Sequence, residues 1–156
     1  MTIQDLGSIG EFVAAIATLA TLGYLALQIR QNTRSMRAAA FQASTTRASG
    51  LSQLLAQDKD LFRIFAAGLR DPSELDDIDR GRLVMLLQAF IRQYEDLFFQ
   101  HRTGALDAES WAAWRGSYKP IVQSAGFSVF WPGRAEAFTA SFRRHLDSEI
   151  RPEDLT

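Results

Sequence analysis

The N-terminal part of the chain contains a long run without charge. No charged residue lies between Glu11 and Arg30, which leaves 18 consecutive uncharged residues. As a helix this run would extend about 27 Å, close to the ~30 Å hydrocarbon thickness of a bilayer. Its few polar side chains do not form the polar stripe that a surface helix needs. The pattern therefore predicts a transmembrane helix.

Two other interpretations of this run remain open. A fully buried helix of a soluble protein would also be apolar on all sides. A secretory signal peptide would begin with positive charge, whereas this chain carries Asp5 and Glu11 and no Lys or Arg before Arg30. The flanking charges thus favour the span over the signal peptide.

A basic segment follows the run. Arg30, Arg34 and Arg37 have i, i+4 and i+7 spacing and share one helix face, where they would contact headgroups at the membrane interface. Lys and Arg accumulate on the cytoplasmic side of membrane spans. We expect a single-pass protein of the inner (cytoplasmic) membrane, with its N-terminus outside, its C-terminal domain in the cytoplasm and the lipid bilayer as a partner.

The rest of the chain is predicted to be helical, so the fold class is all-α. Residues 1–29 would form the membrane anchor, residues 30–57 a basic helical stalk that continues the span, and residues 58–156 a small cytoplasmic helical bundle. Gly50 is the predicted break in the stalk, because glycine is unfavourable inside a helix.

Hydrophobic periodicity predicts four helices in the bundle. The clearest runs from about Ile78 to His101, with apolar residues at three- and four-residue spacing, a cap at Asp76 or Asp77 and an end near Gly104. The others are Asp60–Arg70, a helix that begins near Asp107, and Arg134–Ile150. Pro120 would limit the second of these or open the next helix, and Gly126–Gly133 would be an aromatic loop or a short helix.

Charge is segregated along the chain, although the net charge is only −1. Residues 28–70 carry seven Lys or Arg against two acids, and residues 71–109 carry four against nine. The basic block lacks the interleaved aromatics of a nucleic-acid stacking platform, so no nucleic-acid partner is expected. The chain has no cysteine, which excludes a disulfide framework and a thiolate metal site.

No pattern of catalytic, cofactor or metal-binding residues emerges. Glu95 and Asp96 are adjacent and point to different parts of a helix surface, so we interpret them as surface acids. His145 and Glu149 have i, i+4 spacing, but two ligands do not make a metal site, and a solvent-exposed pair is the favoured interpretation. Neither a Gly-rich phosphate loop nor a nucleophile elbow is present. The sequence predicts no catalytic residue, no cofactor and no metal.

Aromatic residues concentrate in the second half of the bundle. Packing in the core of a small domain is one interpretation. A patch that contacts a partner, the membrane surface or a hydrophobic ligand is the other. The candidate residues are Trp111, Trp114, Tyr118, Phe130 and Trp131.

Small residues recur along one face of the predicted span. Gly10, Ala14, Ala17 and Thr21 have i, i+4, i+7 and i+11 spacing, and small residues let membrane helices approach closely. A homo-oligomer or a partner within a membrane complex is therefore expected.

Two classes of function follow from these patterns. The favoured one is a non-enzymatic, membrane-anchored protein that acts by homo-oligomerisation or partner binding, as a scaffold, an accessory subunit or a pore-like assembly. The alternative is a membrane-tethered sensor or enzyme that binds a small ligand between Tyr94, His101 and the aromatic residues.

Three segments resemble a widespread group of uncharacterised bacterial proteins. They are Leu25–Gln42, Glu95–Asp107 and the Trp111-Ala-Ala-Trp114 motif. The resemblance implies one N-terminal transmembrane helix and a helical cytoplasmic domain, and it implies no activity, catalytic residue or cofactor.

Overall fold

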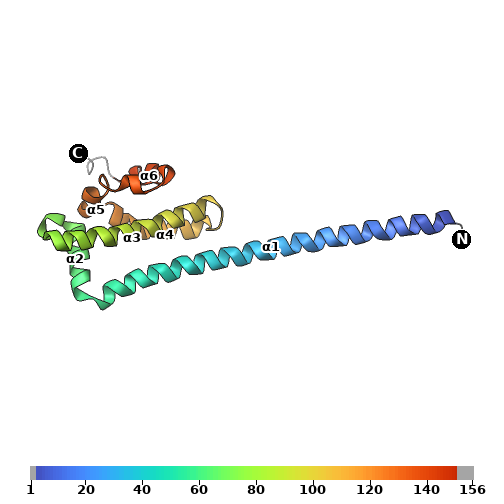
Figure 1. Ribbon diagram of the computed structural model, residues 1–156, viewed down its shortest axis with the longest axis horizontal. Coiled ribbons are helices and arrows are strands. Elements are labelled where there is room, and N and C mark those ends of the chain that lie inside the picture. The colour runs from blue at the N-terminus through green and yellow to red at the C-terminus, as the bar shows by residue number, and fades with distance from the viewer. Residues whose placement is uncertain (1–2, 151–156) are drawn as a thin grey trace. The chain divides into compact units, whose positions relative to one another are not determined.

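The computed structural model describes the backbone of residues 3–150 and the side chains of residues 10–150. Within these residues the chain is helical and contains no strand, which confirms the predicted all-α fold (Figure 1). The α-helices are α1 (Ile3–Gln57), α2 (Lys59–Arg70), α3 (Asp77–Arg102), α4 (Ala108–Val122), α5 (Ala125–Phe130) and α6 (Ala140–Asp147); two short 3-10 helices are η1 (Pro72–Glu74) and η2 (Ala135–Ala137).

Helix α1 continues through Gly50, so the predicted break at this residue is wrong. One glycine costs a helix only about 1 kcal/mol, which neighbouring helix-forming residues offset. The helix instead ends at Gln57, where Asp58 begins α2 and its carboxylate accepts a hydrogen bond from the Leu61 amide at 2.9 Å. An N-cap is a stronger boundary signal than an isolated glycine.

The chain divides after Ala39 into two units, of which the second is a compact helical bundle. Its first segment is the C-terminal part of α1, residues 40–57, for which the sequence predicts a stalk. Ser44 in this segment is fully buried and binds two side chains of α3. Gln93 Nε2 donates to the Ser44 carbonyl at 2.9 Å, and Gln100 Nε2 donates to the Ser44 hydroxyl at 2.8 Å. These bonds tie the end of α1 to the bundle.

Helices α3 and α4 begin at the aspartates that the sequence suggested. Asp76 accepts a hydrogen bond from the Asp79 amide, and Asp107 accepts one from the Ser110 amide, both at 2.8 Å. Gly104 follows α3 with φ 74°, a conformation that glycine adopts without strain. Local capping chemistry therefore set these boundaries as expected.

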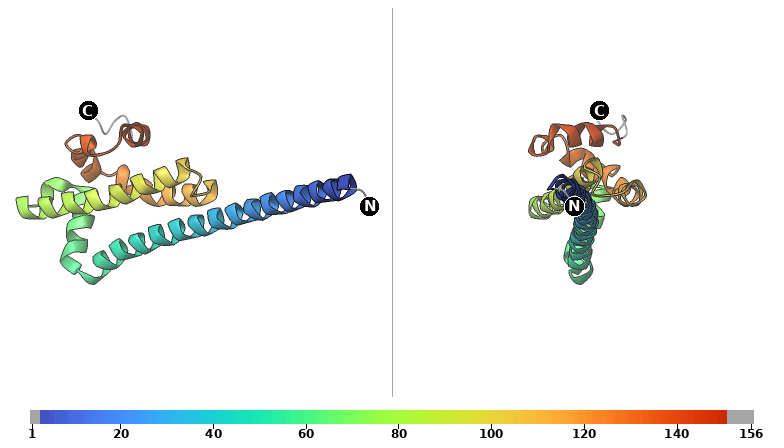
Figure 2. Two further views of the ribbon diagram at one scale, coloured as in Figure 1. Left: turned by 45° about the vertical axis from the view of Figure 1, so that its right-hand side comes forward. Right: turned by 90° about the vertical axis from the view of Figure 1, so that its right-hand side faces the viewer.

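Within the bundle, α2, α4 and α5 pack against α3 (Figure 2). The helices α2 and α5 approach closely at two glycines, Gly68 and Gly126, because a side chain at Gly126 would collide with the Gly68 carbonyl. Helix α6 contacts α3 through Phe142, whose ring centroid lies 5.6 Å from that of Tyr94. The fully buried apolar side chains are Ile64, Leu87, Ile91, Tyr94, Leu97, Val122, Phe127, Phe142 and Leu146.

The single helix predicted for residues 134–150 is wrong. The chain forms η2, extends at Phe138 and begins α6 after Thr139. Glu95 on α3 causes this break, because its Oε1 accepts hydrogen bonds from the Thr139 amide at 2.8 Å and from the Thr139 hydroxyl at 2.9 Å. The break also lets Phe138 turn into the core. Pro120 lies inside α4, which continues to the buried Val122.

Candidate functional site

The N-terminal segment of α1 exposes its apolar side chains. Phe12 is 67% exposed and Leu19 is 69% exposed. None of the residues in the most apolar 18-residue stretch of α1 is buried within the chain, and the helix is long and apolar enough to cross a membrane. The segment is thus not the core helix of this chain. An exposed apolar surface of this extent marks a site of contact with a membrane or another protein.

The two threonine hydroxyls within this segment are satisfied by the helix itself. The hydroxyl of Thr18 donates to the Ala14 carbonyl at 2.9 Å, and that of Thr21 donates to the Ala17 carbonyl at 2.8 Å. These two bonds remove the cost of exposing hydroxyl groups to hydrocarbon.

The residues proposed for membrane contact and helix association lie on the surface of α1. The three arginines Arg30, Arg34 and Arg37 are exposed, and so are the four small residues Gly10, Ala14, Ala17 and Thr21. Their exposure leaves them available for contact, and their roles stay predictions.

The aromatic candidates do not gather on one surface. Tyr118, Phe130 and Trp131 are at most 5% exposed and belong to the core, whereas Trp111 and Trp114 are half-buried. The Trp131 indole donates to the Asp147 carboxylate at 2.8 Å, so its polar atom is satisfied. Core packing accounts for three of the five candidates.

His101 also packs among aromatic side chains. Its ring stacks on Trp111 with the centroids 5.2 Å apart and the planes inclined by 7°. Tyr94 stacks in the same way on Tyr118, with a centroid distance of 4.6 Å. Residues proposed to surround a ligand therefore contact one another directly.

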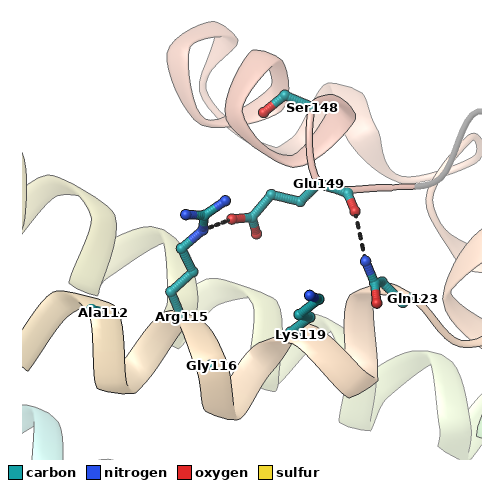
Figure 3. Close-up of a pocket in the computed structure, with 7 residues that line it drawn as sticks. All are labelled: Ala112, Arg115, Gly116, Lys119, Gln123, Ser148 and Glu149. Atoms are coloured by element: carbon teal, nitrogen blue, oxygen red, sulfur yellow. Dashed lines mark hydrogen bonds and ion pairs between the residues drawn. The ribbon is translucent and has the colours of Figure 1, made fainter.

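A polar hollow lies between α4 and the turn that follows α6 (Figure 3). Its volume is about 390 Å³, within the range of small-molecule sites. One wall comes from α4 and its C-cap residue, which place Arg115, Lys119 and Gln123 on one face. The opposite wall comes from Ser148 and Glu149, and the small residues Ala112 and Gly116 complete the lining.

Glu149 is the most connected residue of this hollow. Its carboxylate is only 7% exposed, accepts a hydrogen bond from the Tyr94 hydroxyl at 2.8 Å and forms an ion pair with Arg115. His145 Nε2 lies 3.5 Å from the same carboxylate, and Gln123 Nε2 donates to the Glu149 backbone carbonyl at 3.3 Å. The expectation of a solvent-exposed His145–Glu149 pair is wrong, because α3 and α4 cover it.

Burial and the Glu149 charge set the protonation states around the hollow. Burial and the bond to Glu149 raise the pKa of Tyr94, which stays a hydrogen-bond donor. The hydrogen bond to Glu149 raises the pKa of Arg115. Burial lowers the pKa of His145; Glu149 opposes this change and Arg115 adds to it. At neutral pH the cluster therefore holds a neutral imidazole beside one ion pair.

Glu95 is also buried, contrary to its interpretation as a surface acid. It is 7% exposed, caps Thr139 and pairs with Arg92 at 2.6 Å. Asp96 is half-buried and lies 3.1 Å from Arg47 of α1. Glu95 thus joins α3 to the start of α6, and Asp96 joins α3 to the end of α1. Among the residues that the structure describes, no group of three His, Asp or Glu side chains could bind a metal.

Only part of the hollow can be recognised from the sequence. The i, i+4 spacing of His145 and Glu149 and that of Arg115 and Lys119 are both visible in it. The sequence does not reveal that α4 and the turn after α6 face each other.

Comparisons with known proteins do not extend this picture: no family model, no curated protein and no solved structure matches the chain. The resemblance to a group of bacterial membrane-anchored proteins stays a prediction.

Proposed function

We propose that this chain is a single-pass membrane protein that acts without catalysis, by homo-oligomerisation or by binding a partner. One observation carries the proposal. The N-terminal segment of α1 exposes an apolar surface long enough to cross a bilayer, and such a surface is unstable in water without a membrane or a partner to cover it.

The arginines after the span support a specific orientation. Arg30, Arg34 and Arg37 are exposed, and each would gain about 1 kcal/mol near an anionic cytoplasmic leaflet. The bundle would then lie in the cytoplasm and the N-terminus outside the inner membrane. Arg30 would extend its apolar stem along the helix so that its guanidinium reaches the headgroups.

Association through the span would use the face of Gly10, Ala14, Ala17 and Thr21. In a bilayer the contact between helices is stabilised by close packing rather than by the hydrophobic effect. Thr21 already donates to its own helix, so packing and not an interhelical hydroxyl bond would stabilise the contact. A scaffold, an accessory subunit or a pore-like assembly would each be anchored in this way.

The test is native mass spectrometry of the full chain extracted gently from membranes. We expect the protein in the membrane fraction after alkaline carbonate washing and a defined homo-oligomeric or partner-containing mass. Ala17→Leu should lower the order of a homo-oligomer, because it adds a large side chain on the small-residue face. Ala15→Leu is the matched control, since it makes the same change on another face of the helix.

Two results would contradict the proposal. A monomer in the soluble fraction would exclude the membrane anchor. A monomer in the membrane fraction, unchanged by either substitution and without a partner, would exclude assembly.

A further inference from the structure

The hollow between α4 and the turn after α6 presents hydrogen-bond donors that the fold does not use. Arg115 engages Glu149 through Nε. Within the described residues neither of its two Nη atoms forms a hydrogen bond, and the Arg115 side chain is 57% exposed. A guanidinium with both Nη groups available is suited to bind two oxygens of one anion.

Glu149 holds this guanidinium in place. Both oxygens of its buried carboxylate are engaged, one by Arg115 and the other by the Tyr94 hydroxyl at 2.8 Å. Tyr94 is itself fixed by its stacking on Tyr118. Only the Glu149 side of this ion pair is buried, and a pair whose arginine is exposed contributes little to stability, so its presence is better explained by the positioning of Arg115. A pre-positioned side chain loses less conformational entropy when it binds a ligand.

Lys119 adds a second cation on the next turn of α4. It lies on the same wall as Arg115, and no ion-pair partner is present for it among the described residues. The lining contains two cations, Arg115 and Lys119, and one anion, Glu149, which already pairs with Arg115. Its net charge is therefore +1. The floor at Gly116 is open, because a side chain there would meet no atom within 4 Å. An anion can therefore reach both cations.

We propose that this hollow binds a phosphate monoester group. A phosphate offers three terminal oxygens, which lets the Arg115 fork take two and the Lys119 ammonium take the third. A carboxylate has only two oxygens and would leave Lys119 without a contact. The phosphate could belong to a small molecule or to an anionic lipid headgroup, and both share this chemistry. The site is independent of the proposed assembly through α1.

The test follows the Nε–H signal of Arg115 by NMR in the full chain, labelled with ¹⁵N-arginine and held in phosphatidylcholine nanodiscs. The Arg115 Nε–H signal is assigned as the one that disappears from the spectrum of the Arg115→Gln variant. Inorganic phosphate is titrated to about 10 mM at constant ionic strength, and a parallel sample contains phosphatidic acid in the nanodisc. We expect a saturable shift of the Arg115 signal with an apparent Kd of about 1 mM.

Lys119→Gln is the decisive variant, because Lys119 has no described ion pair whose loss would disturb the fold. It should weaken binding about tenfold, and the exposed Lys59→Gln on α2 should leave binding unchanged. A shift with inorganic phosphate supports a small-molecule source, and a shift only with phosphatidic acid supports the lipid headgroup.

Three results would overturn the proposal: no saturable shift in either sample, an equal shift in Lys119→Gln, or a saturable shift with acetate but not with phosphate.

Discussion

The hydroxyl of Tyr94 donates a hydrogen bond to the buried carboxylate of Glu149 at 2.8 Å. This bond joins the middle of α3 to the turn after α6, across 55 residues of sequence. Arg115 of α4 binds the same carboxylate. One acidic side chain thus connects three helices, and it also forms a wall of the polar hollow.

Tyr94→Phe should destabilise the bundle by about 2 kcal/mol. Hydrogen bonds to charged groups contribute roughly 1.5–3 kcal/mol, and the substitution leaves one Glu149 oxygen buried without this donor. Urea unfolding of the detergent-solubilised chain, followed by tryptophan fluorescence, measures the change. Tyr118→Phe is the matched control, because its ring stacks on Tyr94 and no hydrogen bond of its hydroxyl is present in the described residues. Equal losses in the two variants would contradict the role of the Tyr94–Glu149 bond.

His145 should make the bundle less stable in mild acid. Burial lowers the pKa of His145 in the folded chain below its unfolded value of about 6.5. The unfolded chain therefore takes up this proton at higher pH, so the free energy of unfolding falls as the pH drops below about 6.5. For one proton, the free energy of unfolding changes by at most about 1.4 kcal/mol per pH unit.

The comparison for this prediction is His145→Gln, which cannot take up the proton. Unfolding measured from pH 7.5 to pH 5 should show a shallower slope in this variant than in the unmodified chain. The charged neighbours Glu149 and Arg115 are present in both proteins, so their contributions largely cancel. Identical slopes would show that burial of His145 does not control stability in this range.

Gly126→Ala should destabilise the bundle by about 3 kcal/mol. The added methyl group would collide with the Gly68 carbonyl on α2 and lie 2.9 Å from the Gly68 carbonyl carbon. Backbone atoms cannot move aside like the end of a flexible side chain, so α2 and α5 would separate. Gly81→Ala on α3 is the control, since its methyl group meets nothing within 4 Å. It should stabilise the helix by about 0.5–1 kcal/mol, and a loss at Gly81 would contradict this reasoning.

Replacement of Arg30, Arg34 and Arg37 by Gln should reduce the fraction of chains with a cytoplasmic bundle, because positive charge near the end of a span directs orientation. The chain has no native cysteine, so Thr103→Cys on the exposed end of α3 can report the position of the bundle. A membrane-impermeant maleimide applied to intact cells should label the triple variant more than the parent.

The control for this experiment replaces three arginines of the bundle, Arg63, Arg70 and Arg82. It removes the same charge at a greater sequence distance from the span, and labelling should stay low. Strong labelling of the parent chain would reverse the proposed orientation.

The sequence by itself determined the all-α fold, the helices α3 and α4 and the apolar segment that can span a membrane. Periodic apolar residues predicted α3, and Asp76 and Asp107 predicted where α3 and α4 begin. These features depend on residues three or four positions apart, so local physics is sufficient to encode them.

Only the tertiary structure decided which polar residues are buried. Glu95 and Glu149 read as surface acids in the sequence, yet each is covered by helices that lie more than 30 residues away in the chain. The same long-range contacts broke the predicted last helix at Thr139. A carboxylate becomes buried only where donors from other helices compensate its desolvation, and the identity of those donors is set by packing.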